Sequence, residues 1–407
     1  MTKLVGWVLY GAYLAAFSLA SLAATEWLLG HLAAQAPPER FRFSSFLVRD
    51  DLLGFVGAPD SRWRFVNHFQ GELVEIEGTT DARGLRPLVT NRDCPDCPEI
   101  LMAGDSVLFS HSAPDGGTIP ELLADTLRRH GHEYRVRNLS YAGWSTIQSH
   151  LAVERYLREA AVAGPDVRAV VYAFTPNDVI DNVRYVYRVP VPIVVREEHG
   201  FGIALERNDL EEAFSWRWRL AQWLRGLRLT RLFQQWEILT EEASTNVADY
   251  RASGLDQRDW DFYFPVRDPT VWHAPFEVDW SERYAFVLAQ MRDVAGQRGI
   301  PFAVFHNPWP PYAGGTPSEQ TREAMGFSAQ QMEDFRARWR ASVAFVAKSA
   351  RRLQVDFLPV DQAMFAGFAL DQVLSRPDDW HLNPQGNQLV AEDLARLLLP
   401  RLRAAQP

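Results

Sequence analysis

Cysteine is scarce in this chain, which has only Cys94 and Cys97 among its 407 residues. Two cysteines cannot by themselves complete a four-ligand zinc site, and they are too few for a disulfide-dense scaffold. Positive charge is limited as well: 42 lysines and arginines stand against 51 aspartates and glutamates, for a formal net charge of -9, with no long basic run. Because a dedicated nucleic-acid-binding protein needs a concentrated positive face, we set that class aside.

Apolar and aromatic side chains, by contrast, are plentiful. Hydrophobic residues make up 47% of the chain, which includes 14 tryptophans, and no internal repeat is present. This is the composition of a globular protein and not of a disordered or collagen-like one. The length allows two or three domains, although a single α/β domain with insertions also reaches this size.

Charged residues are absent from Leu4 to Thr25, a stretch of 22 residues. As a helix it would extend roughly 33 Å at ~1.5 Å per residue, enough to cross a bilayer. Lys3 precedes the stretch, which favours a cytoplasmic N-terminus and export of the rest. We therefore expect residues 1–36 to be a transmembrane anchor, in a single-pass inner-membrane protein whose remainder is periplasmic. A cleaved signal peptide, with a small-x-small site at 34–36, and a buried core helix are the alternatives.

An exported location also bears on Cys94 and Cys97, because oxidising compartments favour a local disulfide. A redox-active Cys-x-x-Cys normally precedes a helix, which lowers the thiol pKa. Here Pro98 and an apolar, strand-like run at 100–103 follow instead. A structural staple or an unpaired loop is therefore predicted, with redox or metal chemistry as the alternative.

The region 37–97 is predicted to be a linker followed by a small β-rich segment. Two prolines end the first helix, and residues 39–60 form a polar, arginine-bearing linker. Farther on, the short runs 63–66 and 73–76 lie among glycine-rich turns, a pattern typical of strands.

From residue 98 to 407 apolar strands alternate with helical patterns, apart from an insertion at about 183–280. Continuous apolar runs indicate strands buried on both faces, and apolar residues at helical spacing indicate the helices. The predicted strands are Ile100–Ala103, Tyr134–Leu139, Val167–Phe174, Pro301–Phe305 and Val355–Pro359. The predicted helices are Thr118–Arg129, Thr146–Ala163, Ser281–Arg298, Ala329–Leu353 and Pro384–Leu399. This alternation predicts a five-stranded parallel sheet with helices on both faces.

Polar residues follow these strands at the carboxyl ends, where parallel sheets collect their functional groups. The first strand ends at Gly104-Asp105-Ser106, the second at Asn138–Gly143 and the third at Thr175–Asp178, and Asp378-Asp379-Trp380-His381 precedes the last helix. A serine, amide and glycine donors, and an Asp-x-x-His pair are together the residue types of a serine hydrolase.

These four blocks resemble the SGNH (GDSL) hydrolase family in order and spacing, from about Glu99 to Leu399. The run Asn177–Asn182 is similar to a membrane-anchored bacterial subgroup. The resemblance implies a flavodoxin-like three-layer α/β/α sandwich, here preceded by the transmembrane helix and the β-rich segment. It also implies cleavage of carboxylic esters through an acyl-enzyme, without a metal or cofactor.

The resemblance assigns roles residue by residue. Ser106 would be the nucleophile, His381 the general base, and Asp378 the acid that orients it, with Asp379 as a rival. The oxyanion hole would consist of the backbone N–H groups of Ser106 and Gly143 and the side-chain amide of Asn177. Two departures concern the acyl pocket: Ser110 stands where the family often has glycine, and Ser140-Tyr141-Ala142 where a glycine is common.

The expected substrate is an O-acetyl ester of an envelope polysaccharide, with lipid esters as the second choice. The alternatives are an O-acyltransferase acting on an envelope glycan and a non-catalytic envelope binding protein. Within the insertion, residues 214–239 are rich in tryptophan and arginine. They are predicted to be two helices that pack on the core, form a lid or touch the membrane surface. The run 306–311 is either a pocket wall or a rigid loop, and not a metal site.

Overall fold

The computed structural model describes residues 13–14, 17–18, 20–25, 39–40, 47–69, 72–182, 192–205, 278–308, 328–365, 367–375 and 381–404. The chain divides into two compact units, residues 1–39 with 214–254 and residues 40–213 with 255–407. Residues 20–25 of the first unit are helical. Within the described residues, no helix is both long enough and apolar enough to span a membrane. Most of the predicted anchor, residues 1–36, lies outside them.

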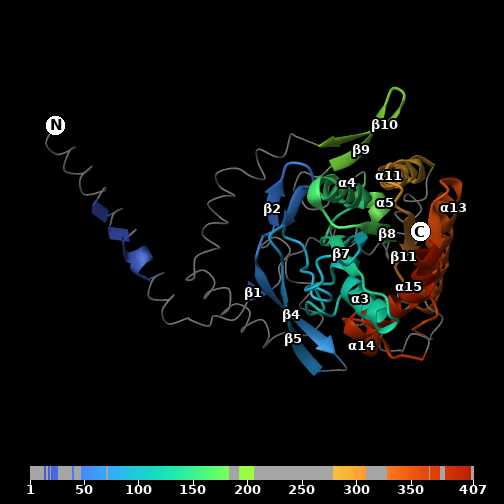
Figure 1. Cartoon of the computed structure of the whole chain (residues 1–407). Helices are drawn as coiled ribbons and strands as arrows, with labels where there is room; N and C mark the ends of the chain where they lie inside the picture. Colours follow the sequence, from blue (N-terminus) through green and yellow to red (C-terminus); the bar gives the residue numbers. More distant parts are fainter. Residues whose placement is uncertain are drawn as a thin grey trace. The chain divides into compact units, whose positions relative to one another are not determined.

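The second unit is built on a five-stranded parallel sheet (Figure 1). Its strands are β6 (Glu99–Gly104), β7 (Arg135–Ser140), β8 (Val167–Phe174), β11 (Phe302–His306) and β12 (Asp356–Leu358). They lie in the order β12-β11-β8-β6-β7, and every neighbouring pair is parallel. Numbered along the chain, this is the 2-1-3-4-5 order of flavodoxin-like folds. The predicted parallel sheet is therefore confirmed.

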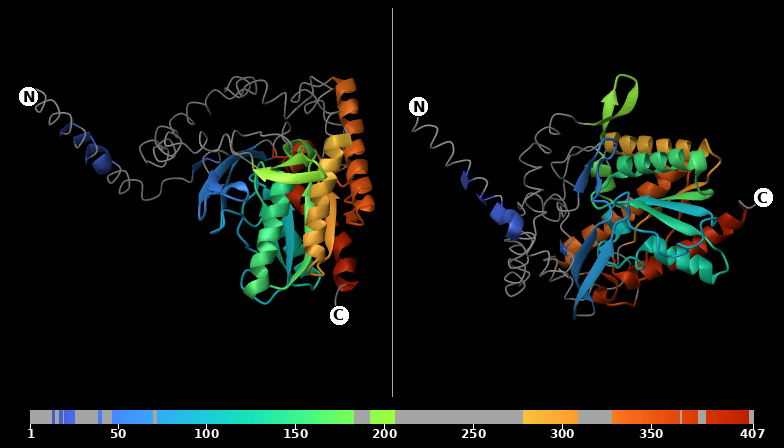
Figure 2. Two further views of the ribbon diagram at one scale, coloured as in Figure 1. Left: turned by 90° about the horizontal axis from the view of Figure 1, so that it is seen from above. Right: turned by 60° about the vertical axis from the view of Figure 1, so that its left-hand side comes forward.

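Helices cover both faces of this sheet, in two pairs on opposite sides (Figure 2). One face packs against α3 (Ile119–Arg129) and α15 (Pro384–Ala404), and the other against α4 (Thr146–Ala163) and α11 (Val278–Gly296). A further helix, α13 (Ala329–Arg352), contributes to both apolar cores. Side chains alternate along each strand, so β8 sends Val171 to one core and Val170 to the other.

Residues 39–97 contain more strands than the sequence predicted. A three-stranded sheet has the order β1-β4-β5, from β1 (Glu39–Arg40), β4 (Arg62–Phe69) and β5 (Glu72–Thr79). The antiparallel strands β2 (Leu47–Asp50) and β3 (Gly54–Gly57) lie inside the predicted polar linker 39–60, so that prediction is wrong here. The reason is the apolar run 53–56: Leu53 and Phe55 are fully buried, and the Trp144 indole donates to the Phe55 carbonyl at 3.1 Å. Cys94 and Cys97 form a disulfide, one form of the predicted staple.

The predicted insertion begins with an antiparallel hairpin that the sequence did not reveal, β9 (Pro192–Glu197) and β10 (Gly200–Leu205). Val194 in this hairpin is 1% exposed, and Arg283 of α11 donates to its carbonyl. The hairpin therefore packs on the sheet domain. The tryptophan- and arginine-rich helices predicted over 214–239 lie outside the described residues.

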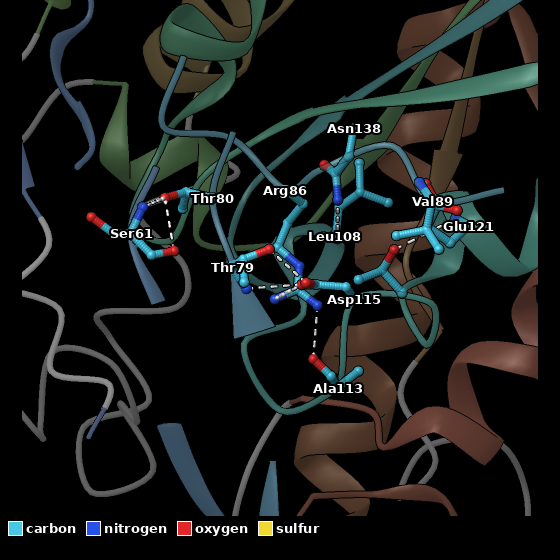
Figure 3. A network of polar contacts seen from close by, with 11 residues as sticks. Ser61, Thr79, Thr80, Arg86, Val89, Leu108, Ala113, Asp115, Glu121 and Asn138 are labelled. Carbon is cyan, nitrogen blue, oxygen red and sulfur yellow. Dashed lines mark hydrogen bonds and ion pairs between the residues drawn. The ribbon is translucent and has the colours of Figure 1, made fainter. Parts of the chain in front are cut away.

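A buried arginine joins the β-rich segment to the loop after the first sheet strand (Figure 3). Arg86 is 1% exposed, its guanidinium lies over the rings of Trp63 and Phe109 at 4.8 and 5.8 Å, and it donates to the Ala113 carbonyl at 2.8 Å. It also pairs with Asp115 at 3.3 Å. The Asp115 carboxylate in turn accepts from the backbone and hydroxyl of Thr79 at the end of β5. This network holds the loop 110–118 against the β-rich segment.

Replacing Arg86 by methionine is expected to lower the free energy of unfolding by about 3–5 kcal/mol, the usual cost of removing one partner of a buried ion pair. Methionine keeps much of the volume between the two rings, so the loss comes from the Ala113 carbonyl and from Asp115, which keeps only its hydrogen bonds from Thr79. Urea unfolding measures it. The matched control is Arg62→Met, since Arg62 and Glu77 form an exposed pair with side chains 70% and 52% accessible. Equal stability of the two variants would contradict the proposed strength of this network.

Candidate active site

The predicted nucleophile lies where β6 ends and a short helix begins. Ser106 is half-buried and is the first residue of α2 (Ser106–Phe109). Asp105 caps this helix, because its carboxylate accepts from the Val107 N–H at 3.0 Å. Glycine at residue 104 suits the close approach of β6 to β8, since a Cβ there would lie 3.1 Å from the Ala173 carbonyl oxygen, a tight contact. The chain therefore presents Ser106 from a firmly held turn.

Asp105 links the ends of three strands. Its carboxylate accepts a hydrogen bond at 3.1 Å from the hydroxyl of Thr175, the residue that follows β8. That hydroxyl in turn accepts one at 2.9 Å from the side-chain amide of Asn307, the residue that follows β11. The Asn177 side chain also hydrogen-bonds to Asp105. Burial raises the pKa of the Asp105 carboxyl, while its hydrogen bonds and nearby His381 oppose that rise. Asn307 belongs to the run 306–311, predicted as a pocket wall or a rigid loop, but it was not among the predicted catalytic and oxyanion residues.

Asn177 is the predicted side-chain donor of the oxyanion hole, and its neighbour Asp178 holds the turn that presents it. The Asp178 carboxylate accepts from the Thr175 N–H and from the Tyr172 hydroxyl, each at 2.7 Å. Asp178 is 1% exposed and begins α5 (Asp178–Asp181), whereas Asn177 is half-buried. A carboxamide carries two N–H donors, so a bond to Asp105 is compatible with a second one to a substrate oxygen.

Gly143 lies in the turn after β7, the strand next to β6. Its φ is +81°, in the left-handed region where a side chain is strained, so the turn requires glycine at this position. The Asn138 amide donates to the Leu108 carbonyl at 3.0 Å, which joins the end of β7 to α2. Gly143 and Ser106 thus follow neighbouring strands, and a hydrogen bond joins the first of these strands to the helix that begins at Ser106.

His381, the predicted general base, lies three residues before Pro384, where α15 begins. It is half-buried, its carbonyl accepts from the Ser375 N–H at 2.8 Å, and its ring packs on His111 with 4.2 Å between centroids. The Ser112 hydroxyl, in the loop that follows α2, donates to the carbonyl of the next residue, Leu382, at 2.9 Å, so His381 lies beside the loop that follows Ser106 and its helix. Asp378 and Asp379 lie outside the described residues, so the acid of the triad stays a prediction.

The departure at Ser110 has a structural explanation. Ser110 ends α2 with φ and ψ of 56°, a left-handed conformation that favours glycine. Its hydroxyl accepts from the Asn387 amide of α15 at 2.8 Å, and the side chain is 1% exposed. The hydrogen bond offsets part of the strain of placing a serine where the family often has glycine.

His306 ends β11 and is 1% exposed, which is too buried for the wall of an open pocket. One ring nitrogen contacts the Ser342 hydroxyl and the other the Asn307 carbonyl, both at 2.8 Å, and the ring packs on Trp339. Burial lowers the pKa of His306 to about 3. For the run 306–311 the alternatives were a pocket wall and a rigid loop, and the burial of His306 agrees with a rigid loop.

Acidification is expected to destabilise the protein through His306. The folded pKa of about 3 lies below the ordinary 6.5, so between these values the unfolded chain binds a proton that the folded one does not. Stability from this group is therefore complete above pH 6.5 and falls as the pH drops toward 3. The loss between pH 7 and pH 5 is about 2 kcal/mol. His306→Gln should lack this part of the pH dependence in urea unfolding, and His130→Gln, at an exposed residue, should retain it.

No family model matches this chain, and no curated protein matches its sequence. Solved structures do match. One is a candidate SGNH hydrolase from Slackia heliotrinireducens, 17% identical over 74% of this chain and 99% of that one, with a TM-score of 0.34. A lipase/acylhydrolase from Enterococcus faecalis is 13% identical over 75% of this chain and 96% of that one, with a TM-score of 0.34. A family 3 carbohydrate esterase from Clostridium thermocellum is 11% identical over 76% of this chain and 98% of that one, with a TM-score of 0.36.

The proposed roles of individual residues rest on the contacts of this chain itself. Asp105, which precedes Ser106, hydrogen-bonds to Asn177, and the ring of His111 in the loop after α2 packs on that of His381. Gly143 follows β7, the strand beside β6.

Proposed function

We propose that this protein is a serine ester hydrolase with Ser106 as nucleophile and His381 as general base. The observation that carries the proposal is the set of contacts on the two sides of Ser106. Asp105, which precedes it, accepts from the Thr175 hydroxyl at 3.1 Å. In the loop after α2, the ring of His111 packs on that of His381 with 4.2 Å between centroids, and the Ser112 hydroxyl donates to the Leu382 carbonyl at 2.9 Å. Three of the four predicted blocks are therefore linked by side-chain contacts. A serine, an imidazole and an amide donor in one place are the groups that acyl transfer needs.

In the proposed reaction the Ser106 Oγ attacks the ester carbonyl carbon as its proton moves to His381. The oxygen of the tetrahedral intermediate accepts hydrogen bonds from the Ser106 and Gly143 N–H groups and the Asn177 amide. His381 then gives its proton to the departing alcohol as the bond from carbon to the alcohol oxygen breaks. Water repeats the sequence on the acyl-enzyme, releasing the acid and restoring Ser106. By family resemblance, Asp378 would orient the imidazole.

The proposed setting is the periplasmic side of the inner membrane. The uncharged stretch 4–25 and the Cys94–Cys97 disulfide support it, since disulfides persist in oxidising compartments. There the substrates would be acyl esters of an envelope polysaccharide or of lipids. Cell fractionation, with alkylation of the two cysteines before and after reduction, tests the location: alkylation without reduction would contradict it.

A fluorophosphonate probe tests the proposed chemistry on the full chain. The expected result is one adduct per molecule, mapped to Ser106 by peptide mass spectrometry, and turnover of p-nitrophenyl acetate. A protein that is folded by circular dichroism but neither labels nor turns over ester would contradict the proposal and favour a binding role. Turnover only in the presence of a sugar acceptor would instead indicate acyl transfer.

A further inference from the structure

Three successive residues after the nucleophile's helix contact the segment that carries the general base. The Ser110 hydroxyl accepts from the Asn387 amide at 2.8 Å, and the Ser112 hydroxyl donates to the Leu382 carbonyl at 2.9 Å. Between them, the ring of His111 meets the ring of His381 at 4.2 Å between centroids and 65° between planes. The two segments are 270 residues apart in sequence.

Burial makes this contact a tight one. Ser110, His111 and Ser112 are 1%, 9% and 0% exposed, so the three side chains have little freedom to move apart from the base segment. The Asn387 amide also donates to the Gly117 carbonyl at 2.9 Å, which fixes the far end of the same loop. His111 therefore reaches His381 from a loop held at both ends.

We propose that His111 is a positioning residue for the general base. Its ring occupies the space beside the His381 imidazole and so limits rotation of that ring away from Ser106. This inference rests on the proposed function and adds a residue outside the family's catalytic blocks. The same loop starts only four residues after Ser106, so nucleophile and base are positioned by one continuous piece of chain. Removing the ring would leave the imidazole room to turn.

Kinetics of two substitutions test the ring contact. His111→Ala is expected to lower kcat for p-nitrophenyl acetate about 10- to 100-fold, the cost of a base displaced by about 1 Å. KM should change less than about threefold, because the acyl and alcohol pockets keep their residues. His111→Phe, which restores a ring, should stay within about threefold of wild type. Equal loss in the alanine and phenylalanine variants, or none in either, would overturn the proposal.

Two further choices keep the result interpretable. His130→Ala is the control, since His130 is exposed at the end of α3. If His111→Ala fails to fold, His111→Val, which leaves part of the space of the ring empty, takes its place and is expected to lower kcat by a smaller factor, about 3- to 10-fold. A change in KM alone would indicate a pocket residue and would also overturn the positioning role.

Nuclear magnetic resonance separates this inference from the proposed function. In protein labelled with ¹⁵N-histidine, the ring signals of His381, assigned through His381→Ala, should shift in His111→Ala and not in His130→Ala. That shift needs no catalysis. If it occurs in a protein that never labels with fluorophosphonate, the proposed hydrolase activity fails while the ring contact stands. Unchanged His381 signals in His111→Ala would refute the positioning role even if ester hydrolysis is confirmed.

Discussion

Ser106→Ala is expected to abolish fluorophosphonate labelling and to lower kcat/KM for an ester by about 10⁴- to 10⁶-fold, the range seen when a triad serine is removed. The reason is that no acyl-enzyme can form without the hydroxyl. Stability should barely change, because Asp105 and not Ser106 caps α2, and Ser106 is half-buried. Steady-state kinetics with p-nitrophenyl acetate and a thermal melt measure the two effects.

The matched control for this prediction is Ser61→Ala. Ser61 lies in the β-rich segment, and among the described contacts its hydroxyl donates only to the nearby Pro59 carbonyl, at 3.1 Å. His381→Ala should lose nearly as much activity as Ser106→Ala. The double variant should be no slower than either single one, because nucleophile and base act as a unit. Additive losses, or more than a tenth of the activity left in Ser106→Ala, would contradict Ser106 as nucleophile.

Much of the fold could be predicted because its signals are local. The run Val167–Phe174, apolar except for Arg168, coincides with β8, and the helical spacing over Thr146–Ala163 coincides with α4. Both elements place apolar side chains in the core of the sheet domain, so the spacing of apolar residues along the sequence follows the faces that are buried. The first three candidate blocks were readable for a similar reason: each follows a strand, and parallel strands end at one edge.

What the sequence did not reveal depends on contacts between distant residues. Leu53 and Phe55 looked like part of a linker, but both are buried in the same apolar core as Trp144. Their carbonyls accept hydrogen bonds from Gln148 and Trp144, respectively. Asn307 lies in a run that the sequence could place after a strand, but its hydrogen bond to Thr175, like the contact of His111 with His381, forms only in the folded protein. No spacing rule links residues that lie on different strands and loops, so these contacts required the structure.

Asn177→Ala is expected to lower kcat by about 10²- to 10³-fold while KM changes little, since an oxyanion donor acts mainly in the transition state. Asn307→Ala is the matched control: its amide belongs to the same network through Thr175, yet no role at the oxyanion is assigned to it. We expect Asn307→Ala to cost less than about tenfold in kcat. If Asn177 only stabilised the turn after β8, Asn177→Ala would lower the melting temperature with kcat of the folded fraction intact. Comparing kcat per active site, counted by fluorophosphonate titration, distinguishes the two roles, because a lost donor slows every correctly folded molecule.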